Sequence, residues 1–353
     1  MEKGCDNCLV FKSSDEKVHY IKEQLPNVNI TLLESQEDNE EAWLAQRNNG
    51  VGGSDVGAIC GLSQFESPLG IYLKKTDQYS EEDSSQFKKD LFHFGHVLED
   101  IVASEYNLRT GQRLFNAGVS FASKKEPWKL ANVDRFILDD KDNIVGILEV
   151  KTTSAFNNSS WSKGDVPLSY LAQLNWYLHV LDLQYGAICV LVGGNRFYSF
   201  EFFRNDEWLN NFILPTVDKF WNVNVQNLKE PDYIGSDAEE ELINKLYPAS
   251  TAKNNELQLD NENVEVLLKE FDSTKKKIKS MEKYATQISN KLKSLMGDYV
   301  VALTPIGKIQ WKPQTQNRID TKLLQAEYPD IARKVTKQVQ FRKFTYKIEG
   351  EEE

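Results

Sequence analysis

Three side chains near the middle of the chain have the types and the spacing for metal-assisted hydrolysis: Asp134, Glu149 and Lys151. Residues i and i+2 of a β-strand face the same way, so Glu149 and Lys151 project together from the polar end of an apolar strand, while Val150 turns into the core. Asp134 belongs to the preceding predicted strand. A turn at residues 139–143 joins both strands into a hairpin, which predicts that Asp134 lies alongside Glu149 or Lys151.

This cluster of residues suits chemistry on a phosphate. Two carboxylates and a backbone carbonyl make an all-oxygen site of the kind that Mg²⁺ prefers. A lysine beside that site can orient an attacking water or neutralise charge that builds on the phosphate. The acid-x-Lys spacing recurs at Asp15, Asp139 and Asp320, but only Glu149 ends a buried apolar strand, where a charged pair is costly without a use. The alternative is a structural salt bridge on an edge strand.

The segments around this cluster predict the elements that must position it. A helix begins near residue 40 and stops before Gly50, and a glycine-rich turn follows in which Ser54 and Asp55 can cap a short helix. Further elements are predicted in this order: a helix 85–108, strands 113–123, 128–138 and 144–153, a helix 168–183, strands 186–192 and 196–203, and a helix 206–225. This order predicts an α/β fold with helices flanking a mixed sheet.

We expect four parts along the chain. They are an N-terminal lead-in at 1–38 with a small peripheral hairpin or strand, a catalytic core at 39–228, a polar linker or polar connecting helix at 229–261 and a basic extension at 262–353. In the extension, apolar residues from Val264 to Leu295 recur at steps of three and four, interrupted by Lys275, which predicts the seam of an antiparallel helical hairpin or of a coiled coil. Strand-like segments follow at 299–303, 307–312 and 341–347.

Charge is distributed unevenly over these parts. The 353 residues include 53 acids and 42 bases, a net charge of −11, and this average disfavours a surface coated with basic patches for nucleic acid. Between Lys269 and Lys347, however, 18 bases accompany 7 acids, so this segment carries +11 and the remainder −22. A basic extension on an acidic domain predicts that any DNA contact is local and weakens with salt.

Two further features bear on location and on metals. No apolar run reaches the ~18 to 20 residues that span a bilayer, and the first residues lack a signal pattern, so we expect a cytoplasmic protein without a membrane partner. Cys5 and Cys8 form a C-x-x-C pair. Because no second pair completes the four ligands of a structural zinc, we expect free thiols there.

Five segments together resemble the PD-(D/E)xK nuclease superfamily, and within it the YqaJ-type viral recombinase branch of the phage lambda exonuclease family. The segments are Arg47 with Gly50-Val51-Gly52-Gly53-Ser54-Asp55-Val56, Phe94-Gly95-His96-Val97-Leu98-Glu99, Ala131-Asn132-Val133-Asp134, Leu148-Glu149-Val150-Lys151-Thr152, and Tyr170-Leu171-Ala172-Gln173-Leu174-Asn175-Trp176-Tyr177. They follow in family order over about residues 40–225. The resemblance implies a restriction-endonuclease-like core, here followed by a C-terminal helical and β extension.

The resemblance also implies roles for the residues of the central cluster. Asp134 and Glu149 correspond to the metal ligands, with the backbone carbonyl of Val150 as a third, and Lys151 corresponds to the catalytic lysine. Glu99 corresponds to an additional acid that supports the metal site.

Four more residues take roles from the same comparison. Gln173 corresponds to a glutamine near the catalytic residues. Arg47 and Ser54 correspond to a pocket for a 5′-terminal phosphate, which an arginine can bind through two N–H groups, and Asn132 corresponds to a further polar contact with phosphate. Arg135 departs from the family, in which glycine is common at this position, and it places a cation close to the metal site.

The implied activity is a Mg²⁺-dependent 5′ to 3′ exonuclease that releases 5′-mononucleotides from double-stranded DNA ends, with Mn²⁺ as a substitute metal. Its product, a 3′ single strand, would serve an annealing protein in phage-type homologous recombination. The resemblance further implies a ring-shaped homotrimer and a phage or prophage gene expressed in a bacterial cytoplasm. The alternatives are another PD-(D/E)xK DNA nuclease, such as an iron-sulfur-dependent one, and a non-catalytic DNA-binding module on this fold.

Overall fold

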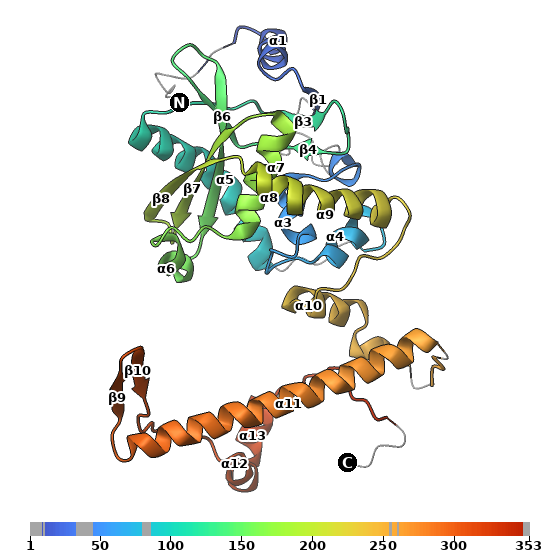
Figure 1. Cartoon of the computed structure of the whole chain (residues 1–353), viewed down its shortest axis with the longest axis vertical. Coiled ribbons are helices and arrows are strands. Elements are labelled where there is room, and N and C mark those ends of the chain that lie inside the picture. Colours follow the sequence, from blue (N-terminus) through green and yellow to red (C-terminus); the bar gives the residue numbers. More distant parts are fainter. Residues whose placement is uncertain are drawn as a thin grey trace. The chain divides into compact units, whose positions relative to one another are not determined.

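The computed structural model describes residues 9, 11–32, 45–79, 86–253, 256–259 and 261–348. The chain divides into two compact units, Met1–Leu246 and Tyr247–Glu353 (Figure 1). Within the described ranges, no helix combines the length and the apolar character needed to cross a membrane. The first unit contains every residue that the sequence assigns to the candidate site.

A five-stranded mixed sheet lies at the centre of the first unit, in the order β2-β5-β6-β7-β8. Its strands are β2 (Arg113–Phe115), β5 (Arg135–Leu138), β6 (Ile144–Thr153), β7 (Tyr185–Val192) and β8 (Arg196–Phe203). The β6–β7 pair is parallel and the other pairs are antiparallel. A parallel pair requires a crossover, and α7 (Leu168–Leu181) lies in this one. The prediction of a mixed sheet flanked by helices is confirmed.

Helices cover both faces of this sheet (Figure 1). On one face, α5 (Gln86–Thr110) places Tyr106 in a buried apolar cluster with Leu148 of β6. On the other face, α7 and α3 (Gly53–Ile59) belong to the main core together with Ile147. Ile147 and Leu148 join different clusters because neighbouring strand residues point to opposite faces. The central strand is therefore apolar on both sides until its charged end at Glu149.

Two predicted strands are each divided between two sheets. The segment 113–123 forms β2 and β3 (Ser120–Ser123), and the segment 128–138 forms β4 (Leu130–Ala131) and β5. β2 and β5 belong to the central sheet, whereas β3 and β4 belong to a second sheet with the order β1-β3-β4. The first break contains Gly118 at φ +59°, where a side chain would be strained. The second break releases Asn132, Val133 and Asp134 from the ladder, so Asp134 precedes its strand instead of lying on it.

The N-terminal segment is more than a peripheral lead-in. It contains α1 (Ser14–Gln24), a helix that was not predicted, and β1 (Val28–Leu32), which pairs antiparallel with β3. Ile21 and Val28 are buried in the main core. Residues 45–48 are helical, in agreement with the helix expected before Gly50. The start of that helix near residue 40 and the pair Cys5 and Cys8 lie outside the described residues.

The boundary of the predicted linker is wrong. A helical run from residue 206 to 225 consists of α8 (Asp206–Trp208), η2 (Leu209–Ile213), α9 (Leu214–Lys219) and η3 (Phe220–Val225), as predicted. Beyond it, α10 (Asp237–Leu246) packs on α4 (Pro68–Lys75). Leu242 is buried in the main core, and Glu239 accepts hydrogen bonds from the N–H groups of Ile234 and Gly235 at 3.0 and 2.7 Å. A helix does form in this segment, as one of the two predicted alternatives had it, but it packs on the first unit and is not a connection.

The second unit is built on one long helix, α11 (Glu262–Met296), so the predicted antiparallel helical hairpin is wrong. A β-hairpin of β9 (Val301–Thr304) and β10 (Gly307–Gln310) follows, in agreement with two predicted strands. Two short helices that were not predicted come next, α12 (Thr321–Glu327) and α13 (Pro329–Val335). The segment 341–347 is not a strand, because no neighbouring strand pairs with it in the described part of the unit.

Candidate active site

The end of β5 leaves one edge of β6 open at the candidate site. β5 begins at Arg135, which pairs with Leu148, so the edge of β6 beyond Leu148 has no described strand beside it on this side. Asp134 fills the place of the next strand residue. Its Oδ2 accepts a hydrogen bond from the backbone N–H of Val150 at 2.7 Å. This bond holds the Asp134 carboxylate against the backbone between Glu149 and Lys151.

The same geometry bears on the carbonyl of Val150. In a strand, the N–H and C=O of one residue point to the same edge, as the paired bonds of an antiparallel ladder require. Because the N–H of Val150 points to Asp134, its carbonyl points to that open edge as well. The structure therefore places a carboxylate and a backbone carbonyl on the same side of β6, as the resemblance implies.

Glu149 has two differently partnered oxygens. The residue is 3% exposed, and its Oε1 accepts hydrogen bonds from Lys151 Nζ and from Gln173 Nε2, both at 2.7 Å. Lys151 also donates to Gln173 Oε1 at 3.1 Å, which closes a triangle between β6 and α7. Oε2 of Glu149 is buried and has no hydrogen-bond partner among the described residues. A buried carboxylate oxygen without a donor is costly unless it binds a cation.

The pKa values of these groups reflect their enclosure. Burial raises the pKa of Asp134 well above its usual range, and the charges of Glu149 and Glu99 raise it further. Burial also raises the pKa of Glu149, although the Lys151 ammonium opposes this change. Burial by itself lowers the pKa of Lys151, but the Glu149 and Asp134 carboxylates together raise it. The site therefore holds excess negative charge that a cation would neutralise.

Glu99 reaches this site from α5 and is held there by Arg135. The Arg135 guanidinium is buried, donates to Glu99 Oε1 at 2.7 Å and also contacts Asp100 and the carbonyl of Asp134. His96 Nδ1 lies 3.7 Å from Glu99 Oε2. Arg135 thus connects α5 to the start of β5. Its positive charge is accommodated next to the acidic cluster because the guanidinium pairs with two acids of the helix, Glu99 and Asp100.

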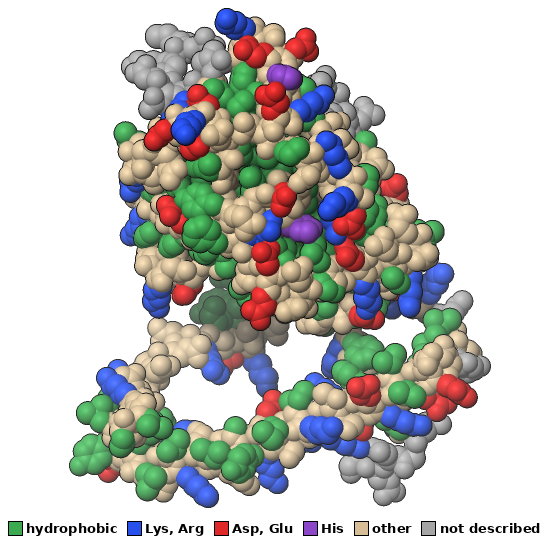
Figure 2. All heavy atoms as spheres, turned by 45° about the horizontal axis from the view of Figure 1, so that its top comes forward, with side chains coloured by type: hydrophobic (Ala, Val, Ile, Leu, Met, Phe, Trp, Pro, Cys, Tyr) green, Lys and Arg blue, Asp and Glu red, His purple; other side chains and the backbone are tan. Residues whose placement is uncertain are grey.

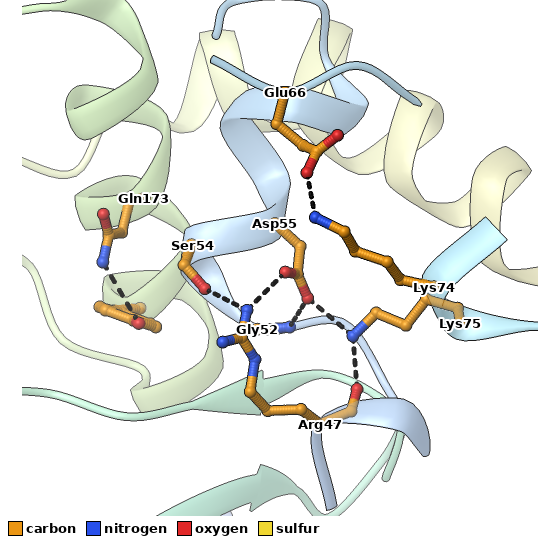
Figure 3. A network of polar contacts seen from close by, with 9 residues as sticks. Arg47, Gly52, Ser54, Asp55, Glu66, Lys74, Lys75 and Gln173 are labelled. Carbon is orange, nitrogen blue, oxygen red and sulfur yellow. Dashed lines mark hydrogen bonds and ion pairs between the residues drawn. The ribbon is translucent and has the colours of Figure 1, made fainter. Parts of the chain in front are cut away.

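A second polar network surrounds Arg47 and Ser54 (Figure 3). The terminal nitrogen Nη2 of Arg47 donates to Ser54 Oγ at 3.0 Å and to Asp55 Oδ1 at 2.9 Å. The other oxygen of Asp55 accepts from Lys75 Nζ at 2.8 Å and from the N–H of Gly52 at 3.2 Å. Lys75 also donates to the backbone carbonyl of Arg47. Asp55 therefore links the arginine, the glycine turn and α4.

The first turn of α3 differs in detail from the prediction. Gly52 is the N-cap, and the Asp55 carboxylate accepts from its N–H group, so Asp55 does cap the helix. Ser54 lies inside the first turn and is exposed. Gly53 has a physical reason for its type, because a Cβ there would meet the Tyr177 ring at 2.4 Å. Tyr177 in turn lies within reach of Gln173, whose Nε2 donates to its hydroxyl at 3.4 Å.

Both networks face one hollow of about 400 Å³. The predicted site residues that line it are Arg47, Ser54, Glu99, Asn132, Asp134, Glu149 and Gln173. Lys151 and Val150 do not line it themselves, but Lys151 is bonded to Glu149 and Val150 to Asp134. Asn132 Oδ1 is buried at its wall and has no hydrogen-bond partner among the described residues. The structure thus brings together all of the side chains that the sequence selected.

Three residues near the site received no role there from the sequence. They are Lys75, Tyr177 and Asp55, of which Asp55 was predicted only as a helix cap and not as the partner of Arg47. Asp55 and Tyr177 stand within quoted segments, so proximity to Ser54 and Gln173 was an available signal. Lys75 has no such signal, since it ends a helix 28 residues after the Arg47 carbonyl that it binds. Among the described residues, no three His, Cys, Asp or Glu side chains are arranged to hold a metal, so a cation would depend on two carboxylates and a carbonyl.

Comparison with known proteins places the chain in a family. Residues 42–184 match the family described as the YqaJ-like viral recombinase domain. The uncharacterized protein YqaJ of Bacillus subtilis (strain 168) is 36% identical over 320 residues, which cover 90% of this chain and 97% of that protein. The chain belongs to the YqaJ-like viral recombinase family. The resemblance to the YqaJ-type viral recombinase branch, drawn from the five sequence segments, is confirmed.

Similar solved structures include nucleases of low sequence identity. An alkaline exonuclease, LHK-Exo from Laribacter hongkongensis, is 14% identical with a TM-score of 0.41, and the match covers 58% of this chain and 99% of that one. The same protein in complex with dAMP is 16% identical with a TM-score of 0.42, and the match covers 54% of this chain and 96% of that one. A phage related exonuclease from Haemophilus somnus 129PT is 12% identical with a TM-score of 0.38, and the match covers 52% of this chain and 99% of that one.

Proposed function

We propose that this protein is a Mg²⁺-dependent exonuclease that degrades one strand of duplex DNA from its 5′ end. The observation that carries the proposal is the buried, unpartnered Oε2 of Glu149 in a hollow shared with Asp134 and flanked by Lys151, within the part of the chain that the structure describes. Membership in a family described as viral recombinases supports DNA as the substrate. Two carboxylates and a lysine beside a hollow of about 400 Å³ together suit hydrolysis of a phosphodiester.

The donor set fits a hard divalent cation. Asp134, Glu149 and the Val150 carbonyl would hold it, because all three supply oxygen and Mg²⁺ prefers oxygen ligands while keeping several waters. When bound, Mg²⁺ supplies Lewis-acid polarisation of a phosphate oxygen and favours ionisation of the attacking water. Mn²⁺, which accepts similar ligands, would substitute. Glu99 would support the site through its negative charge.

The chain's own residues then divide the remaining work. Lys151, held by Glu149 and Gln173, would orient the attacking water and stabilise negative charge that develops on the phosphate. Gln173 keeps the Lys151 ammonium and the Glu149 carboxylate in one geometry. Arg135, by pairing with Glu99, limits the repulsion among the acids. The bond between phosphorus and the 3′-oxygen of the first nucleotide breaks, so this nucleotide leaves as a 5′-mononucleotide with a free 3′-hydroxyl, and the attacked phosphate stays on the DNA as its new 5′-phosphate.

Polarity of digestion would come from the Arg47 network. The guanidinium and Ser54 lie in the same hollow as the acids, and an arginine fork binds a terminal phosphate dianion more tightly than an internal diester. Asn132 would add a polar contact. A 5′-phosphate held there would place the first phosphodiester at Asp134 and Glu149, so each cleavage would release one nucleotide from the 5′ end.

The product would be a 3′ single strand, which a single-strand annealing protein could pair with a homologous sequence in phage-type recombination. We also propose a homo-oligomer, with a ring-shaped trimer as the arrangement that the family resemblance implies, and expression of a phage or prophage gene in a bacterial cytoplasm. Encirclement of DNA by such a ring would favour many cleavages per encounter.

Two rivals lead to different expectations. An iron-sulfur-dependent nuclease of this fold would need cysteines near one another, whereas Cys60 and Cys189 are buried on different elements, and burial raises the pKa of the Cys60 thiol to about 12. A non-catalytic DNA-binding module would not need both Glu149 and Lys151. Both residues are present and paired.

Digestion of linear duplexes with 5′-phosphate or 5′-hydroxyl ends, in Mg²⁺ or in chelator, tests the proposal. We expect Mg²⁺-dependent release of mononucleotides, faster from 5′-phosphate ends, with a label at the 3′ end retained on the DNA. Binding without degradation would instead identify a DNA-binding module. Internal cuts in a circular duplex would indicate a different nuclease of the same fold.

A further inference from the structure

The helix α11 carries a heptad pattern that the proposed nuclease function does not use. Counting from Val264 as position a, the a and d positions are Val264, Leu267, Phe271, Thr274, Ile278, Met281, Ala285, Ile288, Leu292 and Leu295. Eight of these ten residues are large and apolar. Lys275 falls at position e, beside the seam, so the predicted interruption at this residue is wrong. A pattern kept over more than four heptads is typical of a coiled coil.

This seam is exposed within its own unit. The exposed fractions are 46% for Ile278, 66% for Met281, 44% for Ile288 and 84% for Leu295. Phe271 is partly covered, because its ring contacts the rings of Phe344 and Tyr346 in the C-terminal segment at centroid distances of 5.8 and 5.1 Å. Figure 2 shows apolar side chains at the surface of the second unit beside lysines and arginines. Apolar stripes of this length on soluble proteins mark interaction sites.

The opposite side of α11 is basic. Position f holds Lys269, Lys276 and Lys283, followed by Asn290. A helix with an apolar seam on one side and lysines on the other is suited to pair through the seam while its outer side stays in water. Pairing would therefore not bury these lysines.

Charges beside the seam identify what can pair with it. In a parallel coiled coil, residue g of one helix lies next to residue e of the following heptad on its neighbour. For two copies of α11 in register, this rule places Glu270 beside Lys275 of the other copy, and Lys277 beside Glu282. Both combinations are opposite in sign. The three remaining combinations, Asn263 with Leu268, Tyr284 with Ser289 and Lys291 with Met296, contain no like charges.

We infer that α11 pairs in parallel and in register with α11 of a second copy of this chain, through the seam from Phe271 to Leu295 and the charge pairs at Glu270–Lys275 and Lys277–Glu282. This interface lies entirely in the second unit. It does not depend on the proposed nuclease activity, and it is separate from any ring formed by the first unit.

A single cysteine in the seam tests the pairing and its direction. Ile288→Cys is placed in the full chain with Cys5→Ser and Cys8→Ser, because Cys60 and Cys189 are buried. In a parallel pair, the two introduced thiols face each other at disulfide distance. In an antiparallel pair, residue 288 lies opposite residue 271, about 25 Å away along the helix. The matched control is Asn290→Cys, which lies at position f.

We expect mild oxidation to link Ile288→Cys chains into dimers at least about tenfold faster than Asn290→Cys chains, since only facing thiols react within one complex. Equal rates for the two variants would overturn the inference. An occupant other than a second copy would also give no excess linkage in the purified chain, and this result overturns it equally.

A charge reversal tests the register independently. Glu270→Lys in the Ile288→Cys chain places like charges together twice per pair, so we expect linkage to slow about fivefold. Within its own helix, residue 270 has no charged neighbour three or four positions away, so the change acts through the other copy. The double variant Glu270→Lys with Lys275→Glu restores opposite charges and should restore the rate. Failure of the double variant to recover would contradict the proposed register.

Discussion

Glu149 illustrates at the scale of one residue how the site divides its tasks. One oxygen accepts two hydrogen bonds that hold Lys151 and Gln173, and the other has no partner in the described part of the protein. A purely structural salt bridge would leave no reason for the second oxygen to be buried, since an unsatisfied buried acceptor costs about 1–3 kcal/mol. The geometry therefore favours a cation site over the structural alternative.

Lys151 is the residue whose loss should affect chemistry most selectively. We expect Lys151→Ala to reduce nuclease turnover by about 100-fold or more, because it removes the cation beside the reacting phosphate. Duplex binding should change little, since the groups that would bind DNA lie elsewhere. The variant should fold but melt at a lower temperature in chelator, because Glu149 stays buried without its counter-charge. Single-turnover digestion with Mg²⁺ and a binding assay in chelator measure both effects. Lys141→Ala, in an exposed turn, is the control, and turnover at the wild-type rate in Lys151→Ala would exclude the assigned role.

The raised pKa values of Asp134 and Glu149 predict how metal and pH act together. An acid with a raised folded-state pKa destabilises the folded protein as the pH rises above the pKa of the unfolded chain, because folding then encloses a charge. The metal-free protein should therefore lose stability above about pH 4. Mg²⁺ neutralises this charge, so its stabilising effect should grow with pH.

Thermal melts of the wild type and of Asp134→Asn, from pH 5 to 8.5, measure this coupling. The variant keeps an oxygen for the Val150 N–H but has no charge. We expect it to melt at or above the wild-type temperature in chelator at pH 8 and to lose most of the rise that Mg²⁺ causes. Asp140→Asn, on the exposed turn, should respond as the wild type does. An equal Mg²⁺ response in Asp134→Asn would place the metal elsewhere.

Asp55 positions Arg47, and its own pKa reports the strength of that interaction. Burial raises the pKa of Asp55, but Lys75 and Arg47 outweigh burial and lower it. A lowered folded-state pKa means that this group stabilises the fold above about pH 4 and that its contribution disappears as the pH falls through the folded-state value. The network in Figure 3 should thus weaken in strong acid.

We expect Asp55→Asn to lower the free energy of unfolding at pH 7 by about 3–5 kcal/mol, because Lys75 stays buried without a counter-charge. The difference from the wild type should shrink below pH 4. Discrimination between 5′-phosphate and 5′-hydroxyl ends should also fall, since Arg47 loses a partner that orients it. Denaturant melts from pH 7 to pH 2.5 and paired digestions measure the two effects. If a folded variant distinguished 5′-phosphate from 5′-hydroxyl ends as well as the wild type does, Asp55 would not position Arg47.

At the scale of elements, the site depends on where β5 stops. The chain leaves β4, passes through Asn132 and Asp134 outside any ladder, and enters β5 only at Arg135. If β5 began two residues earlier, the N–H of Val150 would pair with a strand and Asp134 would be displaced from it. A short strand thus creates the open edge that the carboxylate occupies.

The helix α10 is an element whose importance its composition conceals. Leu242 is 8% exposed in the main core, so we expect Leu242→Ala to destabilise the first unit by about 2–5 kcal/mol. Glu240→Ala, on the exposed side of the same helix, should change stability by less than about 0.5 kcal/mol. Chemical denaturation of both variants provides the comparison. Equal stability of the two would mean that α10 belongs to a linker after all.

At the scale of the whole molecule, charge separates the two units. The second unit contains the segment with a balance of +11, whereas the rest of the chain carries −22. The acids of the candidate site are part of that negative charge, since Glu99, Asp134 and Glu149 would serve a cation. Attraction to DNA would then arise from the basic unit and from the Arg47 network, while most of the first unit repels it.

A chain that ends at Leu246 tests this division. We expect it to retain the thermal midpoint of the first unit, because the boundary follows the compact core. Its affinity for duplex DNA should fall, and the slope of log K against log salt should become shallower by about 0.9 for each phosphate that the shortened protein no longer neutralises. Binding titrations at several salt concentrations measure both quantities. A slope equal to that of the full chain would show that the basic unit does not bind DNA.

Local patterns in the sequence determined much of this protein. The apolar period of two predicted β6 and β8 to the residue, and the spacing of Asp134, Glu149 and Lys151 was enough to select the acidic cluster. These features are readable because they depend on neighbours within a few positions along the chain. The family resemblance likewise followed from short segments in a particular order.

Only the tertiary structure decided the rest. Two predicted strands were each divided between sheets, because strand ends are set by which partners lie alongside and not by the strand's own pattern. Arg135 met Glu99 and Lys75 met Asp55 across long sequence separations, and no local period records such pairs. The buried side of α10 and the open edge beside Val150 exist for the same physical reason: burial is a property of packed surfaces, which distant segments create together.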